Sequence, residues 1–82
     1  MKYTMNVPPF RDLYYVKKDV QYYLMNDQNA PNTSILIRLN KYVEWDLDES
    51  KLVDWAKEVD FTVTAEKLER KGYLAYRVRR VS

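Results

Sequence analysis

Residues 63–81 read VTAEKLERKGYLAYRVRRV and contain Gly72, the only glycine in this chain of 82 residues. A residue just past the end of a helix commonly adopts a left-handed conformation, which glycine reaches without a clash from Cβ. Tyr73 follows the glycine and can fold back on Leu68, as in a Schellman motif. We therefore predict a short helix that opens at Thr64 and ends at Gly72, with a positive φ at the glycine.

The end of the same stretch, from Tyr73 to Val81, is predicted to form a strand in which apolar and basic residues alternate. Successive side chains of a strand point to opposite faces, and one face of this strand is therefore expected to join the core. The opposite face is basic and would meet solvent or a polyanion. The core set comprises Leu74, Tyr76 and Val78, and the other set comprises Ala75, Arg77 and Arg79.

The N-terminal part of the chain predicts a strand, a long helix and a loop. Apolar and polar residues alternate over residues 3–7, and the two prolines that follow would close this strand. From Pro9 to Asn26 the apolar residues recur at helical spacing, and proline is favourable in the first turn. Residues 26–33 are rich in turn formers and predict a loop.

Residues 34–45 carry two competing periods. Apolar side chains alternate from Ile35 to Leu39 as in a strand, whereas those at 36, 39 and 43 recur as in a helix. The β-branched and aromatic content favours a strand, with a turn into a second strand from Tyr42 to Asp46. If the first strand pairs with residues 73–81, the two form a small antiparallel sheet.

A helix is expected over residues 48–59. An aspartate at the N-cap, here Asp48, satisfies free backbone N–H groups, and Leu47 and Leu52 occupy the positions of a hydrophobic staple around it. Leu52 lies on the apolar stripe of this helix together with Trp55. We therefore predict that Trp55 is largely buried.

The composition excludes most catalytic chemistry. The chain has no cysteine and no histidine, and it therefore lacks disulfides, thiolates, the commonest general base and the commonest metal ligand. One glycine is too few for a phosphate-binding loop, and the acidic run at residues 46–49 lacks the glycine and the later glutamate of a calcium loop. We predict a non-catalytic protein without a metal or a cofactor.

The length of the chain predicts one domain that comprises residues 1–82, because a chain of this size supports one hydrophobic core. No apolar run approaches the roughly 18 residues that span a bilayer. The N-terminus lacks the apolar region of a secretory signal. We therefore expect a cytoplasmic protein that does not enter a membrane.

The net charge of +2 conceals three segments of alternating sign. Residues 1–43 carry six basic and three acidic groups, residues 44–60 two basic and seven acidic, and residues 61–82 six basic and two acidic. The three segments therefore carry +3, −5 and +4. Such a surface can orient on a polyanion or dock on a complementary protein, and the alternative is an ordinary solvated surface.

Residues 49–80 predict two short helices, the motif Glu69-Arg70-Lys71-Gly72-Tyr73-Leu74 and a strand. This order resembles the end of a winged helix-turn-helix domain, and the motif is similar to the helix end before the wing in MerR-like and excisionase-like regulators. The resemblance implies that residues 62–71 form the helix that enters the major groove of DNA. Asp60 departs from it, because the motif has glycine there. The expected fold class is α+β and winged-helix-like, with a long N-terminal helix, two shorter helices and a small antiparallel sheet.

The sequence leaves two functions open. In the first, a small regulator or accessory factor of a phage or mobile element binds double-stranded DNA, alone or as a homodimer. Its expected contacts are Thr62, Thr64, Lys67, Arg70, Lys71, Arg77, Arg79 and Arg80. In the second, a protein-binding module or phage-type inhibitor docks on a host protein through aromatic and acidic side chains. Its expected patch comprises Tyr15, Tyr22, Trp45, Asp48, Asp54 and Glu58.

Overall fold

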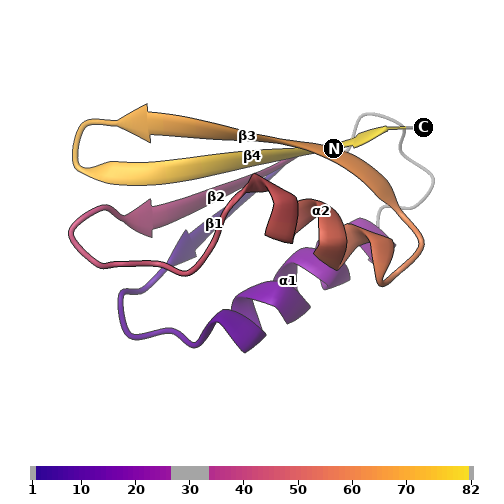
Figure 1. Cartoon of the computed structure of the whole chain (residues 1–82), viewed down its shortest axis with the longest axis horizontal. Helices are drawn as coiled ribbons and strands as arrows, with labels where there is room; N and C mark the ends of the chain where they lie inside the picture. The colour runs from indigo at the N-terminus through magenta and orange to yellow at the C-terminus, as the bar shows by residue number, and fades with distance from the viewer. Residues whose placement is uncertain (1, 27–33, 82) are drawn as a thin grey trace.

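The computed structural model describes residues 2–26 and 34–81, which form a four-stranded sheet with two helices on one of its faces (Figure 1). The elements in chain order are β1 (Lys2–Val7), α1 (Leu13–Asn26), β2 (Ser34–Asn40), α2 (Glu49–Lys57), β3 (Thr62–Arg70) and β4 (Tyr73–Val81). In space the strands lie in the order β1-β2-β4-β3; β1 and β2 are parallel and the other neighbours are antiparallel. The loop expected at residues 26–33 lies outside the described residues, except for Asn26 at the end of α1.

The expected winged-helix-like arrangement with a long N-terminal helix and two further helices is wrong. The described residues contain two helices, and the first of them follows a strand and begins at Leu13 rather than at Pro9. Asp12 favours this start, because its carboxylate accepts a hydrogen bond from the backbone N–H of Tyr14 at 2.9 Å. The chain passes from β1 through α1 to the parallel strand β2, and α1 is therefore the crossover of a β-α-β unit.

The helix predicted from Thr64 to Gly72 is also wrong, because residues 62–70 form strand β3. This strand pairs with β4 along its whole length, and its backbone groups on that side bond to a neighbouring strand instead of within a helix. Gly72 does have a positive φ, of 87°, but it closes the β3–β4 hairpin. Gly72 therefore predicts a left-handed backbone conformation, but it does not predict whether a helix or a strand precedes it.

Residues 34–40 form strand β2, which lies in the middle of the sheet between β1 and β4. This segment pairs antiparallel with residues 73–81, the arrangement on which the expected small antiparallel sheet depended. The second strand expected from Tyr42 to Asp46 is wrong. Asn40 holds a turn there, because its side-chain oxygen accepts the N–H of Tyr42 at 2.8 Å and its carbonyl accepts the indole N–H of Trp45 at 2.9 Å.

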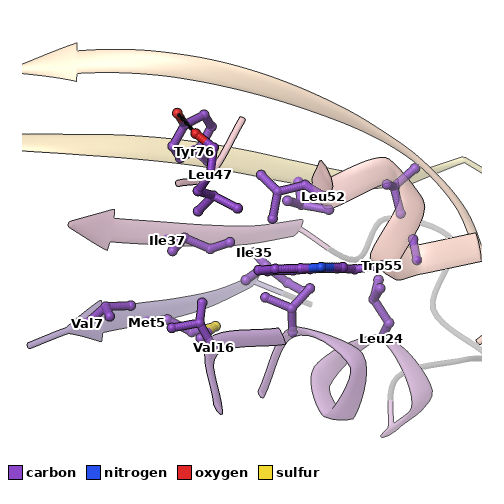
Figure 2. Close-up of a cluster of buried hydrophobic side chains, with 14 of the residues drawn as sticks. Met5, Val7, Val16, Leu24, Ile35, Ile37, Leu47, Leu52, Trp55 and Tyr76 are labelled. Carbon is purple, nitrogen blue, oxygen red and sulfur yellow. Dashed lines mark hydrogen bonds between the residues drawn. The ribbon is translucent and has the colours of Figure 1, made fainter. Parts of the chain in front are cut away.

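The hydrophobic core lies between the sheet and the two helices (Figure 2). Trp55 is 7% exposed, as predicted, and its indole lies between Leu52 of α2 and Leu24 of α1. The buried amide of Gln21 in α1 donates a hydrogen bond to the Trp55 carbonyl at 3.0 Å. That carbonyl lies in the last turn of α2, where intrahelical partners run out, and α1 therefore completes the hydrogen bonding of α2.

The start of α2 is held from two sides. As predicted, Asp48 is the N-cap, and its carboxylate accepts hydrogen bonds from the N–H of Lys51 at 2.8 Å and the hydroxyl of Ser50 at 2.9 Å. The bond from Lys51, followed by that from Ser50, lowers the pKa of Asp48 below its ordinary value. The hydroxyl of Tyr76 in β4 donates to the carbonyl of Leu47 at 3.0 Å (Figure 2). The sheet and the N-terminus of α2 are thereby joined by a hydrogen bond.

The end of α2 has the Schellman geometry that the sequence predicted at Gly72. The N–H of Phe61 bonds to the carbonyl of Ala56 at 2.9 Å, and the N–H of Asp60 bonds to that of Lys57 at 3.1 Å. Asp60 takes the left-handed position with a φ of 65°. An aspartate therefore occupies a backbone conformation for which glycine is the usual residue.

Candidate functional site

The face of the sheet opposite the helices is covered by no helix or strand of the described part of the chain (Figure 1). Because side chains alternate along a strand and directly paired residues share a face, the strand registers assign each residue to one side. We call this side the open face. It comprises Lys2, Thr4 and Asn6 of β1, Ser34, Leu36, Arg38 and Asn40 of β2, Tyr73, Ala75, Arg77, Arg79 and Val81 of β4, and Thr62, Thr64, Glu66, Leu68 and Arg70 of β3.

The open face carries five cations and one carboxylate, namely Lys2, Arg38, Arg70, Arg77 and Arg79 against Glu66. None of the five cations takes part in an ion pair with another described residue. Most of the acidic residues of the chain lie instead in α2 and the loops that flank it, residues 44–60. Folding therefore converts the alternation of charge along the chain into a basic face that is separate from the acidic segment.

Arg38 and Tyr73 form a stacked pair on the two central strands of the open face. The guanidinium carbon lies 4.2 Å from the centroid of the tyrosine ring. The pair is diagonal in the sheet, because Arg38 lies opposite Ala75 and Tyr73 opposite Asn40. The Nε of this arginine is buried and has no hydrogen-bond partner among the described residues, a cost that the cation–π contact offsets in part. Aromatic rings and guanidinium planes are the groups on which unpaired bases stack.

The expected DNA contacts divide between the open face and other positions. The open face contains Thr62, Thr64, Arg70, Arg77 and Arg79. Lys67 lies on the helix side of β3, and Lys71 lies in the hairpin turn. Arg80 also faces the helix side, with its guanidinium carbon 4.6 Å from the centroid of the Phe61 ring. Residues 62–70 form a strand and not the expected recognition helix. The five open-face residues share one side of the sheet because side chains alternate along β3 and β4.

Among the basic and aromatic members of the open face, sequence reasoning missed Lys2, Arg38 and Tyr73. Arg38 stands between Ile37 and Leu39 in a segment that the sequence predicts as a strand. The alternation of that strand therefore already directed this arginine away from the core. Its position beside Tyr73 depends on the register of β2 against β4, for which the sequence carries no signal.

Three side chains of the expected protein-binding patch make contacts within the fold. Trp45 is half-buried, and its indole N–H is bonded to the carbonyl of Asn40. Asp48 caps α2, and Glu58 pairs with Lys17 at 2.8 Å. Asp48 and Glu58 remain exposed, as do Tyr15, Tyr22 and Asp54.

The outer side of α1 and the residues before it are nevertheless unusually apolar. Five large hydrophobic side chains are exposed there, with fractions between 47% and 88%. Two of them also contact cations: Lys18 lies over the Tyr14 ring at 5.4 Å and Arg11 over the Tyr15 ring at 5.7 Å. The five side chains, which we call the α1 aromatic surface, are Phe10, Tyr14, Tyr15, Tyr22 and Met25.

No protein-family model matches the chain, and neither a curated protein nor a solved structure matches it. Within residues 2–26 and 34–81, no helix is long and apolar enough to cross a membrane. The same residues contain no group of three or more candidate ligands that could hold a metal ion. The open face is therefore the strongest candidate site, because its cations form no ion pair within the described part of the chain and Arg38 stacks on Tyr73.

Proposed function

We propose that the protein binds nucleic acid through the open face of its sheet, as a small non-catalytic protein of the cytoplasm. The observation that carries the proposal is the set of five cations on this face that form no ion pair with the described residues. Four of the five are arginines, whose planar guanidinium matches the oxygens of a phosphate. Phosphate contacts of this kind supply most of the affinity of nonspecific nucleic-acid binding.

A single strand suits the open face better than the double-stranded DNA that the sequence suggested. The major groove of B-DNA, about 12 Å wide, admits a helix or a two-stranded ribbon. Here four strands lie side by side, and at about 4.8 Å between neighbours they span roughly 14 Å. In this proposal, unpaired bases stack on Tyr73 and Arg38 while phosphates contact Arg77 and Arg79.

A salt titration of binding tests the proposal. Fluorescence anisotropy would follow a labelled single strand of about 20 nucleotides and its duplex, each over a range of salt concentrations. We expect tighter binding of the single strand. The double variant Arg77→Ala with Arg79→Ala should weaken this binding and lower the salt slope by about 1.4 units, because it removes two phosphate contacts.

The matched control is Lys18→Ala with Lys57→Ala, which removes two exposed cations from the helices and leaves the open face intact. Its salt slope should equal that of the wild type. Tighter binding of the duplex would contradict the single-strand assignment. Undetectable binding of both forms at roughly 50 mM salt would refute the proposal, because nonspecific contacts to phosphate are still strong there.

A second candidate function is favoured by the α1 aromatic surface, since exposed apolar patches with tyrosine and methionine are typical of protein interfaces. The partner would be a host protein or a second copy of this chain. Sedimentation of the wild type and of a Tyr14→Ser, Tyr22→Ser variant separates the two. A dimer that dissociates in the variant indicates self-association, whereas a monomeric wild type directs the search to a different protein.

A further inference from the structure

A second basic feature lies beside the open face. A groove of about 560 Å³ forms where the β3–β4 hairpin turn approaches the residue that follows β2. Asn40, the last residue of β2, lies opposite Tyr73 in the register, which places Lys41 next to the hairpin turn. The charged side chains that line the groove are Lys41, Lys67, Arg70, Lys71 and Glu69.

The charges of this groove are unbalanced. Four cations and one carboxylate line it, and no ion pair among the described residues involves any of them. Two of the cations make weak contacts: the Nη1 of Arg70 lies 3.5 Å from the Glu69 carbonyl oxygen, and the Nζ of Lys41 lies 5.6 Å from the Tyr42 ring centroid. Cations held together in this way repel one another, and a multivalent anion in the groove would relieve the repulsion.

The groove is continuous with the open face, because Arg70 and Tyr73 belong to both. A nucleic-acid strand that crosses the open face along the hairpin therefore reaches the groove where the sheet ends. A terminal phosphate monoester carries about −1.5 to −2 charges at neutral pH, more than a phosphate within the chain. Three lysines supply mobile point charges, and one arginine supplies a planar fork for phosphate oxygens.

We infer that the groove binds the terminal phosphate of a single strand held on the open face. The identification of the ligand as a strand end rests on the proposed function, whereas the ability of the groove to bind phosphate does not. Lys67 and Lys71 are the informative residues, because they line the groove and lie outside the open face. Their removal should affect recognition of the strand end more than binding of the strand.

The test compares three otherwise identical oligothymidylates with a 5′-phosphate, a 3′-phosphate or hydroxyls at both ends. In the wild type, a phosphate at one end should raise the affinity about tenfold, the effect of one charge-assisted contact. The end that gives the gain defines the direction of the strand. In Lys67→Ala with Lys71→Ala the gain should fall below about twofold, and in the control Lys18→Ala with Lys57→Ala it should persist.

Equal affinity of the wild type for all three oligonucleotides would overturn the inference and leave the open-face proposal standing. A gain that persists in Lys67→Ala with Lys71→Ala would also overturn it. Titration with inorganic pyrophosphate alone separates the two proposals further. The wild type could bind pyrophosphate but no oligonucleotide, and Lys67→Ala with Lys71→Ala could lose the pyrophosphate binding. That result would support the groove as a phosphate site and refute nucleic-acid binding by the open face.

Discussion

At the scale of single residues, two left-handed positions shape the C-terminal half of the chain. Gly72 turns β3 into β4 with a φ of 87°, and Asp60 ends the turn after α2 with a φ of 65°. Glycine adopts this conformation at little cost, whereas a residue with a Cβ is strained in it. The chain therefore has its glycine at one of these positions and an aspartate, which tolerates the conformation better than most residues, at the other.

Exchanging these residue types should change stability in opposite directions. Asp60→Gly should raise the free energy of unfolding by up to about 1 kcal/mol, and Gly72→Ala should lower it by about 1 kcal/mol. A Cβ added at position 72 meets no atom within 4 Å, and the cost there is that of the backbone alone. Urea denaturation measures both changes. Asp60→Ala is the control, because alanine keeps the Cβ. If Asp60→Ala stabilised the protein as much as Asp60→Gly, the backbone explanation would be contradicted.

At the scale of elements, the hydrogen bond from Tyr76 to the Leu47 carbonyl joins β4 to the start of α2. Burial, followed by the charges of Glu49 and Asp48, raises the pKa of Tyr76 above its ordinary value of 10.0. The folded state thus favours the neutral phenol. Its contribution to stability is complete below pH 10.0 and is lost as the pH rises through the pKa of the folded protein.

Tyr76→Phe should lower the free energy of unfolding by about 1–3 kcal/mol at pH 7, because the Leu47 carbonyl loses its donor. The difference from the wild type should shrink as the pH rises above 10.0, where the phenol of the unfolded wild type ionises. Urea denaturation over this pH range measures the difference. Tyr42→Phe is the control, because the Tyr42 side chain is 81% exposed. Equal effects of the two substitutions would show that the Leu47 bond does not stabilise the fold.

At the scale of the whole molecule, two surfaces of different chemistry lie on opposite layers. The open face is basic and belongs to the sheet, whereas the α1 aromatic surface belongs to the helical layer (Figure 1). The two proposed functions therefore use different residues. Each can be tested without disturbing the other.

Amide chemical shifts in an NMR titration should map the nucleic acid to one layer. We expect a single-stranded oligonucleotide to shift the amides of β2 and β4, with the largest changes at Arg38, Tyr73 and Arg77, because bases stack and phosphates bind there. The amides of α1 at Tyr15 and Tyr22 should move little. Shifts concentrated in α1 would assign the ligand to the aromatic surface and contradict the use of the open face.

The candidate site was predictable only in part. The alternation of the last strand predicted that Arg77 and Arg79 share a face, because that property depends on neighbouring residues alone. The stack of Arg38 on Tyr73 could not be predicted, since those residues are far apart in the sequence and meet through the register of β2 against β4. The groove likewise requires Lys41 to lie beside the β3–β4 turn.

The sequence by itself determined the features that depend on local pattern. Among them are the N-terminal strand with its period of two, the cap at Asp48, the burial of Trp55 and the left-handed Gly72. Tertiary structure alone decided that residues 62–70 are a strand. Residues 65–70 are all strong helix formers, but β4 offers residues 62–70 a continuous row of backbone hydrogen bonds. Long-range pairing of this kind outweighs local preference, because it satisfies backbone groups and buries Val63 against the core at the same time.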